Sequence, residues 1–166
     1  GVLQQYFAFL NHKPYKKYLL YTFVDVNEIK SSSLPAKKNN DDTFTLIAVG
    51  ALRYPKNQQY LIEAFKLLKN DNIELHIFGD GVMRKELEKM VNEAGVNVII
   101  KGEVKEVSKI LPQYDLYVMS SEFEGFSLSV LEAMAMQMPM LLSDIPSFRE
   151  QCADTALFFD LKNTHD

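Results

Sequence analysis

The stretch after Ser120 is the part of the sequence best equipped for chemistry. Glu124 precedes a helix that we predict to begin near Ser127, and Glu132 lies inside that helix, roughly 7 to 8 Å along its axis at ~1.5 Å per residue. The free N–H groups and partial positive charge of a helix N-terminus suit a phosphate or diphosphate. Carboxylates on either side suit the hydroxyls of a ribose and of a sugar. The pattern predicts a site for one ligand held at both ends.

A second loop supplies positive charge. Residues 50–56 (GALRYPK) begin with Gly50 after an apolar run, and Arg53 and Lys56 in this loop are suited to neutralise a diphosphate. In the loop before the helix, Gly125 lets a ligand approach the backbone closely.

Each of these signals also has a simpler explanation. Glu124 and Glu132 are equally compatible with ordinary solvated acids, and Glu132, beside an apolar stripe, with a buried structural hydrogen bond. A pair of basic loop residues is usually just surface. The spacing alone leaves these alternatives open.

The elements that must position these loops are short apolar runs that alternate with helical patterns from residue 44 onward. Such runs are typical of strands buried on both faces of a parallel sheet. The expected strands are 44–49, 73–78, 96–100, 116–119, 140–142 and 156–159. Between them we expect helices, with Asn57 as one N-cap and Gly95 at one C-terminus. The alternation predicts an α/β domain, doubly wound around a mainly parallel, Rossmann-like sheet.

Ligands of such sheets bind at the carboxyl ends of the strands, where the strand order reverses. If the order is 3-2-1-4-5-6, this crevice lies between the first and fourth strands. Loops 50–56 and 120–126, the two singled out above, then meet there.

Length and composition fit one main domain. The chain has 166 residues, of which 47% are hydrophobic, so residues 44–166 can form a domain with a sizeable core. Residues 1–43 fall outside the alternating pattern. They read as the end of a preceding domain, with a helix at 3–10 and a strand at 18–24, followed by an exposed linker that includes residues 31–42.

Charge and motifs exclude several function classes. The net charge of −4 supplies no general field for nucleic acid, and the single cysteine, Cys152, forms no internal disulfide and is expected to be buried and inert. There is no P-loop, no Asp-x-Asp pair and no Cys/His cluster, and the glycines at 79 and 81 make only an incomplete dinucleotide fingerprint. His76 reads as a packed strand residue. We therefore expect no metal and no cofactor.

The residues around the predicted helix resemble a known signature. The run 121–135 (SEFEGFSLSVLEAMA) looks like the E-x7-E signature of the retaining glycosyltransferases of family 4, within glycosyl transferases group 1, with Glu124 and Glu132 as its acids. The similarity extends over about residues 17–160 and includes IFGDG (77–81), KGEV (101–104), YDL (114–116) and SDIPSFRE (143–150).

The resemblance implies the C-terminal, donor-binding half of a two-domain GT-B enzyme. It implies that Glu124 contacts the donor sugar, Glu132 the ribose and Lys56 the diphosphate, with Lys56 and Glu124 as the catalytic pair. By the same analogy, the amides of Phe126, Ser127 and Leu128 bind the sugar and diphosphate, and the Gly102–Val104 loop binds the nucleobase.

The resemblance also implies partners and a location. The donor is a nucleotide diphosphate sugar, and the acceptor is a glycan or lipid-linked saccharide bound through an N-terminal domain. The expected setting is surface polysaccharide biosynthesis in the cytoplasm, compatible with peripheral association of the full-length enzyme with the inner membrane face. This chain alone is expected to bind donor weakly and to be inactive in transfer.

One residue departs from the family pattern. Position 51 is Ala51, where the family usually has an arginine beside the lysine on the diphosphate, and Arg53 is the candidate substitute. This departure keeps a non-catalytic nucleotide-binding module open as an alternative. A GT-B nucleotide-sugar epimerase or phosphorylase is the other.

Overall fold

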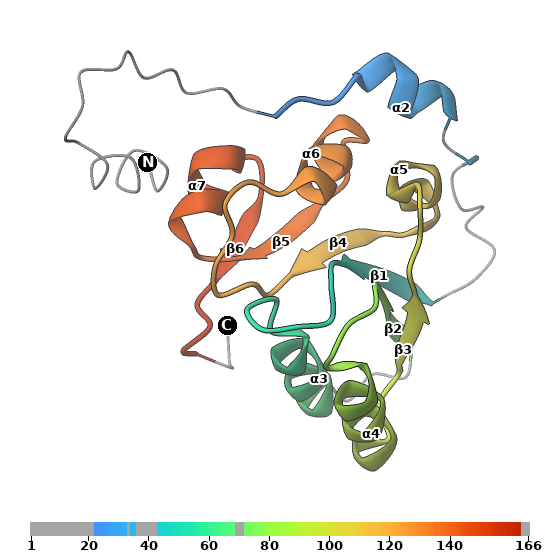
Figure 1. The fold of residues 1–166 in the computed structure, drawn as a ribbon, viewed down its shortest axis with the longest axis vertical. Helices are drawn as coiled ribbons and strands as arrows, with labels where there is room; N and C mark the ends of the chain where they lie inside the picture. The colour runs from blue at the N-terminus through green and yellow to red at the C-terminus, as the bar shows by residue number, and fades with distance from the viewer. Residues whose placement is uncertain (1–21, 33, 36–42, 69–71, 164–166) are drawn as a thin grey trace.

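Six parallel strands form one sheet in the order β3-β2-β1-β4-β5-β6 (Figure 1). The computed structural model describes residues 22–32, 34–35, 43–68 and 72–163. The strands are β1 (Phe44–Val49), β2 (Ile73–Phe78), β3 (Val98–Gly102), β4 (Leu116–Met119), β5 (Met140–Ser143) and β6 (Leu157–Phe159). The order reverses between β1 and β4, which confirms the doubly wound, Rossmann-like fold.

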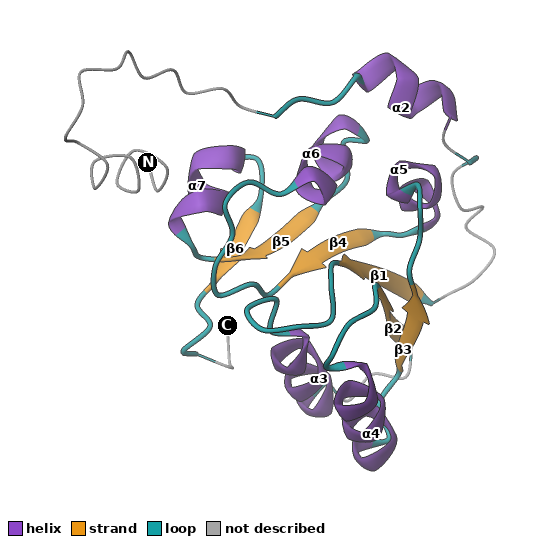
Figure 2. Cartoon of the chain, viewed as in Figure 1, coloured by secondary structure: helices purple, strands orange, loops and turns teal. Residues whose placement is uncertain are grey.

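Helices cover both faces of this sheet, with α3 and α4 on one side and α5, α6 and α7 on the other (Figure 2). The helices are α2 (Val26–Ser32), α3 (Gln58–Leu67), α4 (Arg84–Ala94), α5 (Val107–Ile110), α6 (Leu128–Ala135) and α7 (Pro146–Cys152), and a 3-10 turn spans Leu111–Gln113. Side chains of a strand alternate between faces, so in β1 Leu46 and Ala48 join the core under α3, whereas Ile47 joins the core under α6. Both faces are buried, which is why the strands read as continuous apolar runs.

The two central strands part before their carboxyl ends. β1 pairs with β2 along its whole length, from Phe44 to Val49, but with β4 only at Leu46 and Ile47. At the opposite end the strands are held more firmly, because the Asp115 carboxylate accepts from the Thr45 amide at 2.7 Å and from its hydroxyl at 3.0 Å. The sheet therefore opens at the edge where the crevice was expected.

Local sequence signals mark some of the helix ends. Gly95 ends α4 in the left-handed region, with φ of 61°. Ser127 caps α6, since its side-chain oxygen accepts from the Val130 amide at 3.4 Å. Asn57 takes the predicted N-cap position of α3, but it has φ of 53° and its side chain makes no capping hydrogen bond. Its backbone carbonyl instead accepts from the Ser120 hydroxyl at 2.8 Å.

A helix that the sequence pattern did not predict precedes the sheet. Asp25 starts α2, because its side chain accepts from the amides of Asn27 at 2.9 Å and Glu28 at 3.1 Å. The helix buries Ile29 and packs against α5 and α6. Ser31, placed in the exposed linker by the sequence, lies in this helix.

Most other expectations for residues 1–43 fall outside the described residues. These are the helix at 3–10, residues 18–21 of the predicted strand at 18–24, and the linker residues 37–42, whereas the described residues 22–24 form no strand, so this part of the prediction is wrong. The domain boundary near residue 43 accordingly stays a prediction.

Candidate functional site

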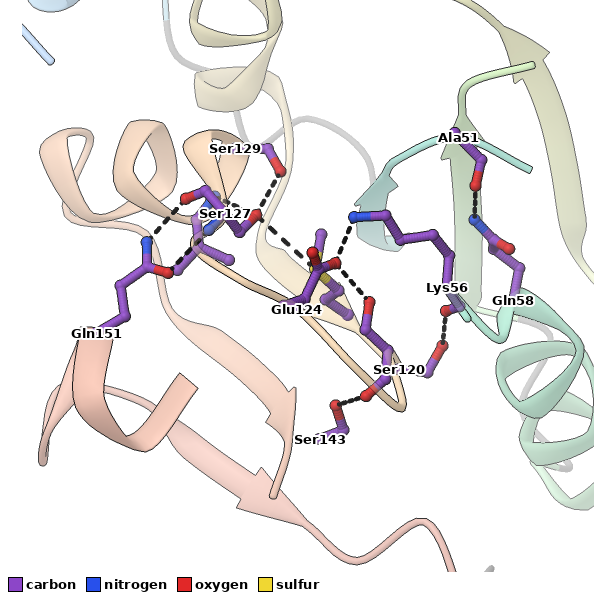
Figure 3. Close-up of polar contacts among 12 residues, drawn as sticks. Ala51, Lys56, Gln58, Ser120, Glu124, Ser127, Ser129, Ser143 and Gln151 are labelled. Carbon is purple, nitrogen blue, oxygen red and sulfur yellow. Dashed lines mark hydrogen bonds and ion pairs between the residues drawn. The ribbon is translucent and has the colours of Figure 1, made fainter. Parts of the chain in front are cut away.

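The loops after β1 and β4 meet at the carboxyl edge of the sheet, as predicted. The Glu122 amide donates to the Pro55 carbonyl at 2.9 Å, which joins the two loops directly. The buried Ser120 hydroxyl, which donates to the Lys56 carbonyl at 3.3 Å, gives a second connection (Figure 3). The crevice between these loops is the candidate site.

Lys56 and Glu124 form an ion pair across the crevice (Figure 3). Their side chains are only 19% and 11% exposed, so solvent screens the pair less than an ordinary surface pair. The Ser121 hydroxyl donates to the same carboxylate at 2.8 Å. The Lys56 side chain lies over Gly50, with its Cδ 3.5 Å from the position that a Cβ would take there. The structure thus brings together the cation and the anion predicted for neighbouring parts of one ligand.

Buried polar side chains hold both loops from beneath, and the sequence reasoning missed them. The Ser143 hydroxyl donates to the Ser121 carbonyl at 2.6 Å, and the Gln58 amide donates to the Ala51 carbonyl at 3.0 Å. Both side chains are buried. Buried polar groups need partners, so a serine that ends an apolar strand was the available signal.

The N-terminus of α6 lies at the same edge of the sheet because α6 follows β4. The hydroxyls of Ser127 and Ser129 are 3.2 Å apart, and Tyr117 donates to Ser129 at 2.8 Å. Burial raises the pKa of the Tyr117 hydroxyl, which keeps it a proton donor. The first turn of α6 is therefore tied to the central sheet.

The residues around this helix start differ in their surroundings. Phe126 is half-buried, whereas Leu128 is exposed. Among the described residues, no atom lies within 4 Å of the position that a Cβ on Gly125 would take. The space beside Gly125 is therefore open to a ligand.

Gln151 of α7 engages both backbone groups of Ser127. Its Oε1 accepts from the Ser127 amide at 3.1 Å, and its Nε2 donates to the Ser127 carbonyl at 2.8 Å (Figure 3). The Ser127 amide, one of the three expected to bind donor, already has an internal partner. Anion contacts are then expected from the following amides of α6.

Glu132 is a half-buried acid rather than a freely solvated one. Burial raises the pKa of its carboxyl, and a hydrogen bond from the Ser108 backbone partly offsets this rise. The carboxylate thus connects α6 to α5. This is the structural hydrogen bond that the sequence left open, and its predicted contact with a ribose stays a prediction.

Replacing Glu132 with glutamine is expected to raise the thermal unfolding midpoint at pH 7. The raised pKa means that the folded chain holds the Glu132 proton more tightly than the unfolded chain does, so stability falls as the pH rises through the carboxyl range. Glutamine removes this cost and keeps an oxygen for the Ser108 amide. The gain should shrink as the pH is lowered toward the ordinary carboxyl range, and Glu93→Gln, at an exposed position, serves as the surface control. A gain independent of pH would contradict the assignment.

A cleft of about 350 Å³ opens beside the crevice at the ends of β1, β2 and β3. It is lined by Val49, Gly50, Ala51, Phe78, Gly79, Asp80, Glu103, Val104 and Lys105. Of the predicted site residues, Gly50 and Val104 line it, whereas Gly102 is buried outside the lining and its carbonyl accepts from the Gly79 amide at 2.7 Å. Arg53 is exposed and is not among the lining residues, so the structure does not bring it into this cleft.

Gly79 and Gly81 have a packing role that the incomplete fingerprint concealed. A Cβ on Gly79 would stand 2.0 Å from the Gly50 carbonyl oxygen, and one on Gly81 would stand 2.4 Å from that of Leu52. Their φ angles are 148° and 157°. These two glycines let the β2 loop lie directly against the β1 loop.

A larger hollow, of about 370 Å³, lies away from the crevice, on the α3 face. It is lined by Leu46, Tyr60, Leu61, Ala64, Phe65, Leu67, Leu68, Val118, Leu141 and Phe159. None of these side chains carries a charge that could hold a diphosphate. We therefore assign the site to the smaller cleft and the crevice.

Other sequence expectations can be placed in the same way. His76 is a partly buried strand residue whose Nδ1 lies 2.8 Å from the Tyr114 hydroxyl. Cys152 is buried, which raises the pKa of its thiol to about 11. Across the described ranges, no cluster of three or more His, Cys, Asp or Glu side chains is placed to hold a metal ion. No described helix has the length and apolar character needed to cross a membrane.

Comparison with known proteins gives a family. Residues 30–166 match the family described as glycosyl transferases group 1. The N-acetylgalactosamine-N,N'-diacetylbacillosaminyl-diphospho-undecaprenol 4-alpha-N-acetylgalactosaminyltransferase of Campylobacter jejuni is 29% identical over 133 residues, covering 79% of this chain and 36% of that protein. The chain spans about a third of the length of the first curated relatives it matches.

Solved structures agree with this match. TarM of S. aureus has a TM-score of 0.80 over 98% of this chain and 33% of its own, at 23% identity, which shows the shared fold. The pneumococcal O-GlcNAc transferase GtfA, solved with UDP and GlcNAc, has a TM-score of 0.61 at 28% identity, over 73% of this chain and 24% of its own. Because the family match takes in most of the chain and the fold agrees, this chain belongs to the glycosyl transferases group 1 and forms one Rossmann-like half of a GT-B fold.

Proposed function

We propose that this chain is the C-terminal, donor-binding half of a retaining glycosyltransferase of family 4. The complete enzyme moves a hexose-type sugar from a nucleotide diphosphate sugar to a glycan or lipid-linked acceptor in surface polysaccharide biosynthesis. The observation that carries this proposal is the half-buried Lys56–Glu124 pair at the crevice. It supplies one cation for a diphosphate and one carboxylate for sugar hydroxyls, side by side.

Two of the similar proteins support particular parts of the proposal. The C. jejuni relative is named for an alpha linkage and a diphospho-undecaprenol acceptor. The pneumococcal structure holds UDP and GlcNAc. We therefore favour a uridine diphosphate sugar as donor, an acceptor held by an N-terminal domain, and a cytoplasmic reaction at the inner membrane face.

The donor fits the site in one direction. Its nucleobase occupies the cleft beside Val104, and its ribose lies toward Glu132. Its diphosphate bridges Lys56 and the N-terminus of α6, and its sugar reaches Glu124. The 350 Å³ cleft is of the size that small-ligand sites have.

The proposed sugar transfer depends on electrostatic stabilisation of the leaving diphosphate rather than on an enzyme nucleophile. The bond between the anomeric carbon and the diphosphate oxygen breaks, and the acceptor oxygen bonds to the same face of that carbon. The acceptor proton passes to the departing diphosphate. Negative charge grows on that leaving group, where Lys56 and the α6 dipole stabilise it.

Calorimetric titration of this chain with UDP, GDP and ADP, in EDTA, tests the proposal. We expect one nucleotide to bind without metal, and Glu132→Ala to weaken that binding by about 1 to 3 kcal/mol, the cost of unmade polar contacts. Binding that required a divalent metal, or no binding by the folded chain or by the complete protein, would contradict it.

Replacing Gly125 with valine is expected to weaken nucleotide-sugar binding while leaving folding intact. Among the described residues, apart from the two chain neighbours, no atom lies within 4 Å of the position that a Cβ would take at Gly125, so the valine Cβ would stand in the open space that we assign to the ligand. We expect a fall in affinity of at least about tenfold, from steric exclusion of the diphosphate. The checks are calorimetry with a UDP-sugar and thermal unfolding. Unchanged affinity would place the ligand elsewhere.

A non-catalytic nucleotide-binding module is the second candidate, and Ala51 is the observation that favours it. The arginine expected at this position is absent, and Arg53 is exposed outside the cleft. Sugar transfer by the complete protein would exclude this candidate. Sugar transfer that the complete protein performs only after Ala51→Arg would support this candidate.

A further inference from the structure

The start of α6 is held by one side chain from another helix. Gln151 lies on α7, and its amide group makes two hydrogen bonds, both to the backbone of Ser127 (Figure 3). Gln151 is half-buried, so these bonds are shielded from water in part. A side chain that bonds to both backbone groups of one residue restrains the backbone conformation of that residue.

The two bonds fix the two peptide planes on either side of Ser127. The Ser127 amide belongs to the plane shared with Phe126, and the Ser127 carbonyl belongs to the plane shared with Leu128. In a trans peptide the N–H and C=O point in opposite directions. The Ser127 carbonyl also accepts from the Leu131 amide at 3.2 Å within α6, so Gln151 adds a second donor that further restrains this peptide plane, whose other side carries the Leu128 amide out of the N-terminal end of α6.

The remaining groups of this turn are already assigned. Four N–H groups at a helix start have no partner within the helix. Gln151 takes that of Ser127, and the Ser127 hydroxyl takes that of Val130. The amides of Leu128 and Ser129 are the two through which α6 can bind an anion. Their direction depends on the planes that Gln151 holds.

We infer that Gln151 is a positioning residue for the donor diphosphate, acting through the Ser127 backbone to aim the first-turn amides of α6. This rests on the proposed function and deepens it, since it adds to the crevice a residue from α7 that the sequence signature does not contain. Gln151 itself touches no ligand in this arrangement.

Gln151→Met in this chain tests the inference with UDP as the probe. Methionine keeps the length of the side chain and loses both hydrogen bonds. We expect the Kd for UDP to rise about tenfold, and the Ser127 and Leu128 amide signals in NMR spectra to move and exchange faster with solvent. Arg149→Met, on the same helix, is the matched control, because it breaks the ion pair to Asp144 and leaves Ser127 untouched.

The outcomes separate the two levels of the argument. If wild-type chain binds UDP and Gln151→Met binds it equally well, the positioning role is overturned and the proposed function stands. If both α7 variants weaken UDP binding in proportion to lost stability, Gln151 has only a structural role and the inference is again overturned. If neither this chain nor the complete protein binds any nucleotide, the proposed function and the positioning role of Gln151 are both overturned. Weakening confined to Gln151→Met, with shifted Ser127 and Leu128 signals, supports it.

Discussion

Replacing Lys56 with methionine is expected to lower sugar transfer by the complete enzyme about 100- to 1,000-fold, the usual cost of removing one preorganised charge from a developing anion. Lys56 is the cation of the half-buried pair, and no other basic side chain contacts Glu124 among the described residues. Methionine preserves the aliphatic contact over Gly50 and removes only the charge. The measurement is kcat and KM with a UDP-sugar, beside UDP binding to this chain.

Glu124→Gln and Lys66→Met are the matching controls. Lys56 is bonded to Glu124, so we expect donor binding to draw the lysine from that carboxylate toward the diphosphate. Glu124→Gln removes the competing charge and should therefore bind UDP at least as tightly as wild type, yet transfer poorly. Lys66→Met breaks only an exposed ion pair with Glu63, so it should leave UDP binding and sugar transfer unchanged. Equal losses of UDP binding in the Lys56 and Glu124 variants would refute the exchange of partners.

Gly79→Ala is expected to cost at least about 3 kcal/mol of unfolding free energy, because strain and overlap add at one position. The new Cβ would stand 2.0 Å from the Gly50 carbonyl oxygen, at a φ of 148° that side chains rarely adopt. Relief requires the β2 loop to move away from the β1 loop. That movement would also distort the 350 Å³ cleft.

Urea unfolding measures this cost, with Gly125→Ala as the control. Both substitutions add one methyl group to a loop at the same edge of the sheet. Only Gly79 has backbone atoms in the way, so Gly125→Ala should change stability by less than about 0.5 kcal/mol. A comparably small change at Gly79 would show that the close approach of the loops is dispensable.

Features governed by nearby residues were predictable from the sequence. The strand at 44–49 is recognisable because both of its faces are buried, and Gly95 and Ser127 mark helix ends through their own backbone and side chains. The meeting of the two loops followed from the strand order that the alternation suggested. The position of the crevice was therefore predictable from the sequence.

Contacts between distant parts of the chain could not be predicted in the same way. Lys56 and Glu124 were assigned to the ligand, but their direct pairing depends on how two loops close over 68 residues of separation. Gln151 reaches Ser127 from another helix, and no local pattern indicates which backbone a glutamine will engage. Local geometry also overrode propensity, since Val96 lies in a turn bonded to Val98 and β3 starts later than the apolar run.

The pairing between β1 and β4 makes the crevice depend on segments that lie far apart in the chain. Each half of the sheet joins strands that are close in sequence, whereas this seam closes a loop of about 70 residues and is held by the pairing at Leu46 and Ile47, by the Asp115 carboxylate and by the contacts between the two loops. Ile47 of β1 packs in the core under α6, and Val118 of β4 packs in the core under α3, so an opening of the seam that separated Lys56 from Glu124 would also expose residues of both cores. A ligand that spans both loops binds only the form in which the two loops meet. A bound nucleotide would therefore stabilise that form and protect the domain against proteolysis.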